Sequence, residues 1–192
     1  GSEMCIRDSP KIVAELLERG CDLRGVPGFF IDEESGKWKL DIRATGIMIP
    51  DRNCMGQIEA IQIRLDHDKR SKFNTLTSVD KYYGAVASCC PHFIGVEDDV
   101  DAVYLTEGVM KADIARYFSV ALGHPCAFVG LTGVGNINQY IRALSELKAF
   151  GISTIKVAFD MDLNVNENVR KARERVIQVG SEAGFEMIPK RW

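Results

Sequence analysis

The pattern of hydrophobic and polar positions changes near residue 100, and the two halves of the chain predict different structures. From residue 101 onward, apolar runs alternate with amphipathic stretches. This predicts strands at 102–106, 126–130, 153–159 and 185–188, and helices at 109–121, 136–149 and 165–183. Such alternation is typical of a parallel sheet flanked by helices on both faces, with right-handed crossovers. The second half is therefore predicted to be an α/β domain.

The first half predicts a small α+β subdomain. Ser9 and Pro10 suit the start of a helix, and Gly20 marks its end. Residues 78–100 are predicted to be rich in loops, with the strand patterns before them at 29–32, 37–42, 46–50, 57–65 and 72–77. We place this subdomain at 9–98 and the α/β domain at 99–192. Residues 1–8 resemble a tag or non-native leader and are set aside.

Composition and charge narrow the class of protein. Hydrophobic residues make up 46% of the 192 residues, which is enough for a folded core. No apolar run is long enough to span a membrane and no secretory signal is visible, so we expect a cytoplasmic protein. The six cysteines form no CxxC pair, which argues against a zinc ribbon and favours reduced thiols. The net charge is −3, yet Lys and Arg exceed acids over residues 35–96, so a polyanion would meet a local basic patch.

Carboxylates stand where two of the predicted buried strands end. Glu107 follows the strand at 102–106, and Asp160 and Asp162 follow the strand at 153–159. The carboxyl ends of parallel strands share one edge of a sheet, where such folds hold their ligands. Converging carboxylates repel one another unless a cation lies between them, and oxygen ligands suit Mg²⁺, with Mn²⁺ as the alternative ion. The pattern predicts metal-assisted chemistry on phosphates.

Basic side chains cluster in the first half. Arg64, Lys69, Arg70 and Lys72 lie within nine residues, as a phosphate-binding surface requires, although a mixed-charge hairpin tip in water gives the same pattern. The basic residues at 170–175 are interpreted as the solvated face of a helix.

Two further features are given no catalytic role. His67, His92 and His124 have neither metal-ligand spacing nor a paired acid. The segment 132–136 resembles a phosphate-binding loop but lacks its Lys and its spacing, so we predict a strand-to-helix turn capped by Asn136 or Asn138.

Together these residues resemble the Toprim domain of bacterial replicative primases. Toprim domains carry Glu-Gly after one strand and Asp-x-Asp after a later one, as at 106–108 and 160–162. Primases add upstream motifs that match 47–50, Gly56, 61–64 and 72–74. The chain also resembles the Toprim-like domain of plasmid and phage replication proteins, through Val26-Pro27-Gly28-Phe29, the run at 106–113 and Asn166 after the Asp-x-Asp.

The resemblance implies a DNA primase, a nucleotidyltransferase that makes primers during replication of a mobile element. Glu107, Asp160 and Asp162 would bind Mg²⁺ and be catalytic, whereas Arg64, Lys72, Lys111 and Asn74 would bind nucleic acid or nucleotide. The implied partners are a single-stranded DNA template, nucleotide triphosphates and a replicative helicase, with no membrane.

The chain departs from the primase pattern at one metal-ligand position, and two alternative functions stand beside the primase interpretation. Primases usually carry an Asp four residues after the Glu, and this chain has Lys111 there, with Asp113 two residues further on. A Toprim nuclease that hydrolyses phosphodiesters would use similar acids. A non-catalytic module that binds single strands would need no metal.

Overall fold

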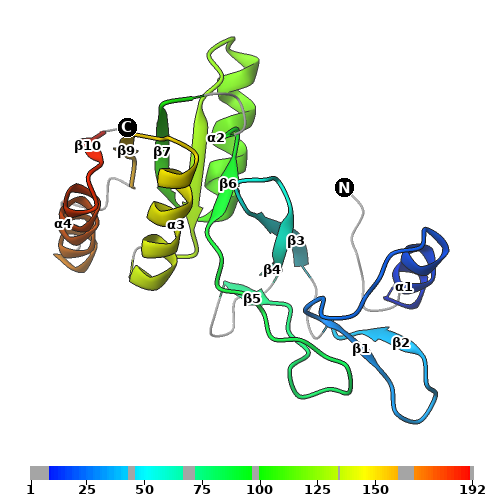
Figure 1. Ribbon diagram of the computed structural model, residues 1–192. Helices are drawn as coiled ribbons and strands as arrows, with labels where there is room; N and C mark the ends of the chain where they lie inside the picture. The colour runs from blue at the N-terminus through cyan, green and yellow to red at the C-terminus, as the bar shows by residue number, and fades with distance from the viewer. Residues whose placement is uncertain are drawn as a thin grey trace. The chain divides into compact units, whose positions relative to one another are not determined.

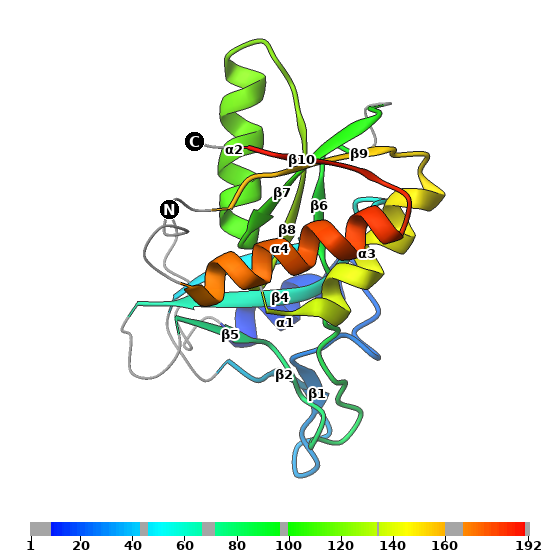
Figure 2. The same cartoon turned by 90° about the vertical axis from the view of Figure 1, so that its left-hand side faces the viewer.

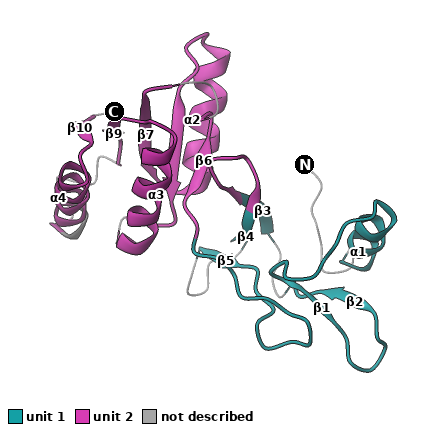
Figure 3. Cartoon of the chain, viewed as in Figure 1, with its two compact units in different colours: residues 1–50, 59–89 teal, residues 51–58, 90–192 magenta. Residues whose placement is uncertain are grey.

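The computed structural model describes residues 9–42, 46–66, 72–96, 100–133, 135–159 and 167–190. The chain divides into two compact units. Each unit is made of two segments, because the backbone leaves the first unit after residue 50 and returns to it at residue 59. Unit 1 comprises residues 1–50 and 59–89, and unit 2 comprises residues 51–58 and 90–192 (Figure 3). The domain boundary that the sequence predicts between residues 98 and 99 stays a prediction.

Unit 1 begins with a helix and a hairpin. Helix α1 (Ser9–Glu18) packs against the hairpin strand β2 (Trp38–Leu40), which pairs antiparallel with β1 (Phe29–Ile31). In the hairpin turn, hydrogen bonds from Ser35 and Lys39 lower the pKa of Asp32 to about 2. The core under these elements consists of Val13, Leu23, Phe29, Leu40, Ile42, Ile63 and Leu76.

A second, three-stranded sheet has the order β3-β4-β5. Its strands are β3 (Gly46–Arg52), β4 (Ile58–Leu65) and β5 (Phe73–Thr75). Strands β4 and β5 pair antiparallel, with Arg64 opposite Phe73. All three residues of β5 are exposed, so this strand presents its side chains to solvent.

Unit 2 is built on a five-stranded sheet with the order β10-β9-β7-β8-β6. Strands β7 (Ala102–Glu107), β8 (Ala127–Leu131), β9 (Thr154–Val157) and β10 (Glu186–Pro189) run parallel. The helices are α2 (Val109–Ala121), α3 (Ile137–Ala149) and α4 (Glu167–Glu182). Figures 1 and 2 show α3 and α4 against one face of the sheet and α2 against the other. The predicted parallel α/β sheet flanked by helices is confirmed.

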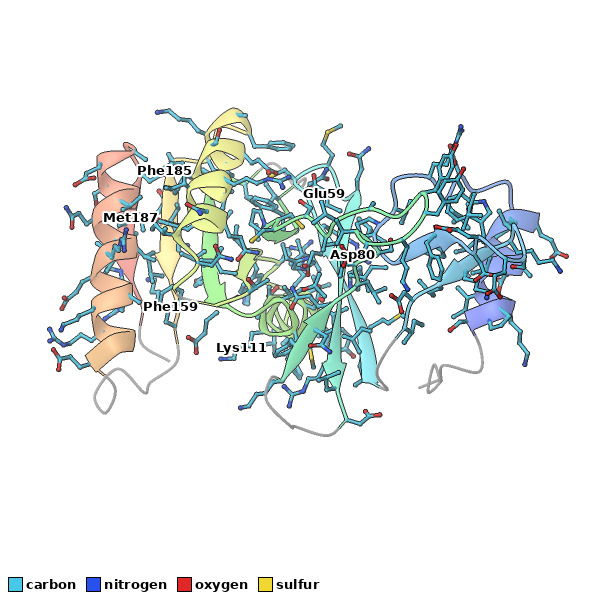
Figure 4. The ribbon with its side chains drawn as sticks, turned by 90° about the horizontal axis from the view of Figure 1, so that it is seen from below. Glu59, Asp80, Lys111, Phe159, Phe185 and Met187 are labelled. Carbon is cyan, nitrogen blue, oxygen red and sulfur yellow. The ribbon has the colours of Figure 1, made fainter. Side chains whose placement is uncertain are left out.

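The main core lies between the sheet and the helices α3 and α4. Alternate strand residues such as Val103, Leu105 and Ile155 point into it and are fully buried. The Tyr140 hydroxyl of α3 donates a hydrogen bond of 3.0 Å to the Val176 carbonyl of α4, and burial raises the pKa of this phenol. Met187 and Phe185 lie where α4 passes into β10 (Figure 4), so the short last strand is held by packing.

The described residues of 78–100 are mostly loop, as predicted, but they include strand β6 (His92–Ile94), which the sequence did not predict. It pairs antiparallel with β8 at the edge of the sheet, with His92 opposite Gly130. Three residues are too few for alternation to reveal a strand, and His92 and Phe93 are both buried. Among the described residues, no helix is long and apolar enough to cross a membrane.

Gly130 lets α2 pack closely on β8, and its replacement tests this contact. A Cβ at Gly130 would lie 3.0 Å from the Gly108 carbonyl oxygen and 3.0 Å from Val109 Cα, which are both backbone atoms. We expect Gly130→Ala to lower the free energy of unfolding by about 1–3 kcal/mol, because backbone must move. Gly133→Ala is the control, since no atom lies within 4 Å of its Cβ position. Urea denaturation that gave equal stabilities would contradict the close approach.

Candidate active site at the carboxyl edge of the sheet

Glu107 is the last residue of β7 and stands at the carboxyl edge of the parallel sheet. Its strand partner is Leu131, the last residue of β8, and the Gly108 amide donates to the Leu131 carbonyl at 2.6 Å. Gly108 has a φ of 110°, a conformation that L side chains rarely adopt. The backbone therefore turns sharply straight after Glu107, and helix α2 starts at the next residue.

Thr106 holds the other side of this turn. It is buried, and its hydroxyl lies 3.4 Å from the carbonyl oxygens of both Gly108 and Val129. A side chain fixed in this way limits the movement of the backbone on either side of Glu107. The Glu107 carboxylate, 22% exposed, can therefore meet a ligand at this edge without a large rearrangement.

Lys111 lies one helical turn after Glu107 and is its ion-pair partner. The Lys111 ammonium donates to the Glu107 carboxylate at 3.1 Å, and the two side chains are 46% and 22% exposed. The residue that departs from the usual primase pattern is thus a counter-ion for the candidate metal ligand. Partial exposure weakens the pair, so a cation or a phosphate can compete with it.

Asp160 and Asp162 lie outside the described residues, but the strand that leads to them is well placed. Val157 of β9 pairs with Leu105 of β7, and the Ala158 amide donates to the Leu105 carbonyl at 2.9 Å. Two residues beyond this pair come Glu107 on one strand and Phe159 on the other. Figure 4 shows Phe159 and Lys111 toward the same edge, with Phe185, which precedes β10, toward the opposite one.

Within the part of the chain that the structure describes, no three His, Cys, Asp or Glu side chains form a metal-binding group. Glu107 would give Mg²⁺ one carboxylate, and the other protein ligands of a site would have to come from the segment that follows Phe159. The metal assignment of Glu107, Asp160 and Asp162 stays a prediction.

His92 has a paired acid, contrary to the sequence analysis. The ring is fully buried, its Nδ1 accepts a hydrogen bond from the Arg52 amide at 3.0 Å, and its Nε2 lies 3.0 Å from Asp113 Oδ1. Because Nδ1 is the acceptor, the neutral ring carries its proton on Nε2 and donates to Asp113. This pair joins β6 to α2 beside the carboxyl edge. The separation of 21 positions between His92 and Asp113 hides the pair from any local motif.

The buried side-chain amide of Gln139 holds Thr132, just after the end of β8, against the start of α3. Gln139 accepts hydrogen bonds from the amide and the hydroxyl of Thr132, at 2.8 and 3.1 Å, and donates to the Cys90 carbonyl. The Asn136 side chain caps α3 by accepting a hydrogen bond from the backbone amide of Gln139. The predicted capped turn is confirmed, with Asn136 as the cap. The part played by Gln139 was missed, because its signal is a single residue inside an amphipathic helix.

Two of the predicted nucleic-acid-binding residues, Arg64 and Lys72, lie in β4 and just before β5. The Arg64 guanidinium lies over the Phe73 ring, with 5.3 Å from Cζ to the ring centroid. Lys72 is exposed just before β5, and the Leu65 amide donates to its carbonyl at 3.1 Å. Asn74 is also exposed, but it pairs with Ile63, so strand alternation puts it on the opposite face from Arg64 and Phe73. The structure thus groups Arg64 with an exposed aromatic ring and not with Asn74.

Comparison with solved structures identifies the fold. The Aquifex aeolicus primase, with its zinc-binding and RNA polymerase domains, superposes with a TM-score of 0.58 and 19% identity, over 94% of this chain and 41% of that chain. A DNA primase domain from Pseudomonas aeruginosa gives 0.52 and 19%, over 92% of this chain and 56% of that one. The DnaG primase catalytic domain bound to single-stranded DNA gives 0.53 and 12%, over 92% and 55%.

These comparisons concern structure alone. No family model matches the sequence, and no curated protein gives a significant sequence match. The chain spans about half the length of the primase structures that it resembles. At these identities the likeness establishes architecture and not the roles of residues. The fold of the chain is that of Toprim-containing DNA primase catalytic cores.

Proposed function

We propose that the chain carries out metal-dependent nucleotidyl transfer and makes primers in DNA replication, as a DNA primase does. The observation that carries this proposal is the position of Glu107. It ends a buried strand at the carboxyl edge of a primase-type sheet, beside the strand that leads to Asp160 and Asp162. The substrates would be a single-stranded template and nucleotide triphosphates.

In this reaction the 3′-hydroxyl of the growing primer attacks the α-phosphorus of a nucleotide triphosphate and pyrophosphate leaves. Glu107, Asp160 and Asp162 would hold Mg²⁺ or Mn²⁺, which would lower the pKa of the attacking hydroxyl and offset the charge that develops on the leaving group. Lys111 would release Glu107 when the metal binds, and its ammonium would then be free to contact a phosphate. The distance of 3.1 Å between Lys111 Nζ and the Glu107 carboxylate supports this exchange of partners.

The basic side chains of unit 1 would hold the nucleic acid. Arg64 offers a cation over an aromatic ring and Lys72 is exposed, whereas Asn74 would contact a phosphate or a base from the opposite face of β5. A plasmid or phage replication system and a replicative helicase partner rest on the sequence resemblance alone and belong to this proposal.

A non-catalytic module that binds single strands is the second candidate. The observation that favours it is the Glu107–Lys111 ion pair, because a neutralised carboxylate needs no metal. The two candidates differ in one property: only the enzyme requires its acids.

Removal of the acids tests the catalytic proposal. In a primer-synthesis assay with labelled nucleotides on single-stranded DNA, we expect Asp160→Asn and Glu107→Gln each to lower the rate by about a hundredfold or more, because the charge that binds the metal is lost. Asp101→Asn is the matched control, since Asp101 precedes β7 at the end opposite to Glu107. Both active-site variants should stay folded by circular dichroism. Full activity in either variant would contradict the metal assignment, and nucleotide-independent cleavage of DNA with Mg²⁺ would favour the nuclease.

The salt dependence of binding tests the basic surface. We expect Arg64→Ala and Lys72→Ala each to reduce the slope of log affinity against log salt by roughly 0.7 on single-stranded DNA, because each variant loses one phosphate contact. Lys171→Ala is the control, because Lys171 pairs with Glu167 at 2.8 Å on the solvated face of α4. Fluorescence anisotropy at several salt concentrations measures the slope. Slopes equal to that of the unmodified chain in both variants would remove β4 and β5 from the binding surface.

A further inference from the structure

Two neighbouring tyrosines of unit 1 stand in solvent after β5. Tyr82 and Tyr83 are 53% and 54% exposed, and their rings meet edge to face with centroids 4.7 Å apart. Aromatic side chains this exposed leave most of their apolar area in water, which is costly unless a partner covers them. The pair was not singled out by the sequence, because its only signal is two adjacent aromatic residues in a loop.

The backbone at Tyr83 is strained. Its φ is +55°, and it is the only residue other than glycine with a positive φ in the described part of the chain. A bulky side chain in this conformation is a genuine outlier, and such strain is typical of positions kept for function. Asn or Gly would adopt this conformation more easily, yet the chain has an aromatic residue here.

The loop that carries the tyrosines is held from below. The Ser78 hydroxyl is buried; it accepts from the amides of Gly28 and Ala85, at 3.2 and 3.0 Å, and donates to the Phe29 carbonyl at 2.7 Å. The Ile31 amide of β1 donates to the Tyr82 carbonyl at 2.9 Å. Figure 1 shows this loop running from β5 down toward β1. The rings are thus presented by a rigid support, which lowers the entropy cost of binding.

The charges around the rings are balanced. The Lys81 ammonium lies 5.5 Å from the centroid of the Phe30 ring. Asp80 precedes Lys81, and Arg24 is paired with Asp22 at 2.6 Å. Little net positive charge remains for phosphates. Tyr82 and Tyr83 would therefore hold a ligand by contact with their rings more than by attraction to charged side chains.

We propose that Tyr82 and Tyr83 form a stacking platform for unpaired bases of single-stranded nucleic acid. Every base offers a flat π-face, and stacking on an aromatic side chain needs no sequence match. The platform belongs to the same unit as Arg64, Phe73 and Lys72 and follows β5 in the chain. This inference rests on the proposed function, and it adds a subsite where contact is with bases and not with the phosphate backbone.

Binding to two oligonucleotides of equal charge tests the platform with the full chain. The first is a fluorescein-labelled oligothymidine, and the second is a strand of the same length that lacks bases. We expect Tyr82→Ala and Tyr83→Ala each to weaken oligothymidine binding by about tenfold, which corresponds to about 1.4 kcal/mol, and to leave the salt slope unchanged. The abasic strand should bind all three proteins alike. Tyr117→Ala is the control, because Tyr117 is 70% exposed on α2 in the other unit.

The outcomes separate this inference from the proposed function. If Arg64→Ala lowers the salt slope while both tyrosine variants bind oligothymidine as tightly as the unmodified chain, the platform is wrong and the basic surface stands. If the tyrosine variants weaken binding of the abasic strand as much as they weaken binding of oligothymidine, the rings support the fold and the platform is also wrong. If the unmodified chain binds neither strand, both proposals fail.

A strain-relieving variant provides a second readout. Tyr83→Asn places a residue that tolerates positive φ at the same position. We expect its Tm to rise by about 2–4 °C while its affinity for oligothymidine falls as in Tyr83→Ala. A lower Tm with unchanged affinity would show that the ring serves the fold, and would overturn the platform.

Discussion

The candidate site depends on one close approach between two backbones. Helix α2 begins immediately after Glu107, and it can do so only because Gly108 turns with a positive φ and Gly130 offers no side chain to the backbone passing over it. The turn is then closed by the amide of Gly108 on the carbonyl of Leu131. A side chain at either glycine would move the start of α2 and with it the carboxylate. Packing in the sheet thus fixes where the candidate chemistry can occur.

The ion pair at this edge of the sheet can be replaced by another cation. Lys111 neutralises Glu107 at the protein surface, where an ion pair contributes little to stability and is readily replaced. A divalent ion shared with further carboxylates would bind Glu107 more strongly than one ammonium does. In this proposal Lys111 pairs with Glu107 in the metal-free state and becomes available to phosphate when the metal binds. In the same proposal unit 1 would add cations and aromatic rings, the side-chain types that commonly bind single strands.

The sequence predicted what depends on local pattern and missed what depends on distant contacts. The strand before Glu107, the glycine turn and helix α2 follow from residues close together in the chain, and the structure has them where the pattern put them. Strand β6 was missed because three residues carry no period, and the His92–Asp113 pair because only the sheet brings the two together. The resemblance predicted Asn74 as a binding residue. It could not predict on which face of β5 Asn74 lies, because that face is set by the register between β4 and β5.

The central claim is that a divalent ion binds at the carboxyl edge of the sheet, and Mn²⁺ tests it most directly. Mn²⁺ broadens the NMR signals of amides close to it, so backbone spectra taken during a titration locate the ion without any assay of activity. We predict that the amides of Glu107 and Gly108 broaden first, that those of Ala102 and Ala127 at the opposite strand ends do not, and that Asp160→Asn removes the effect. Uniform broadening, or broadening at Ala102 and Ala127 first, would contradict a metal site at Glu107.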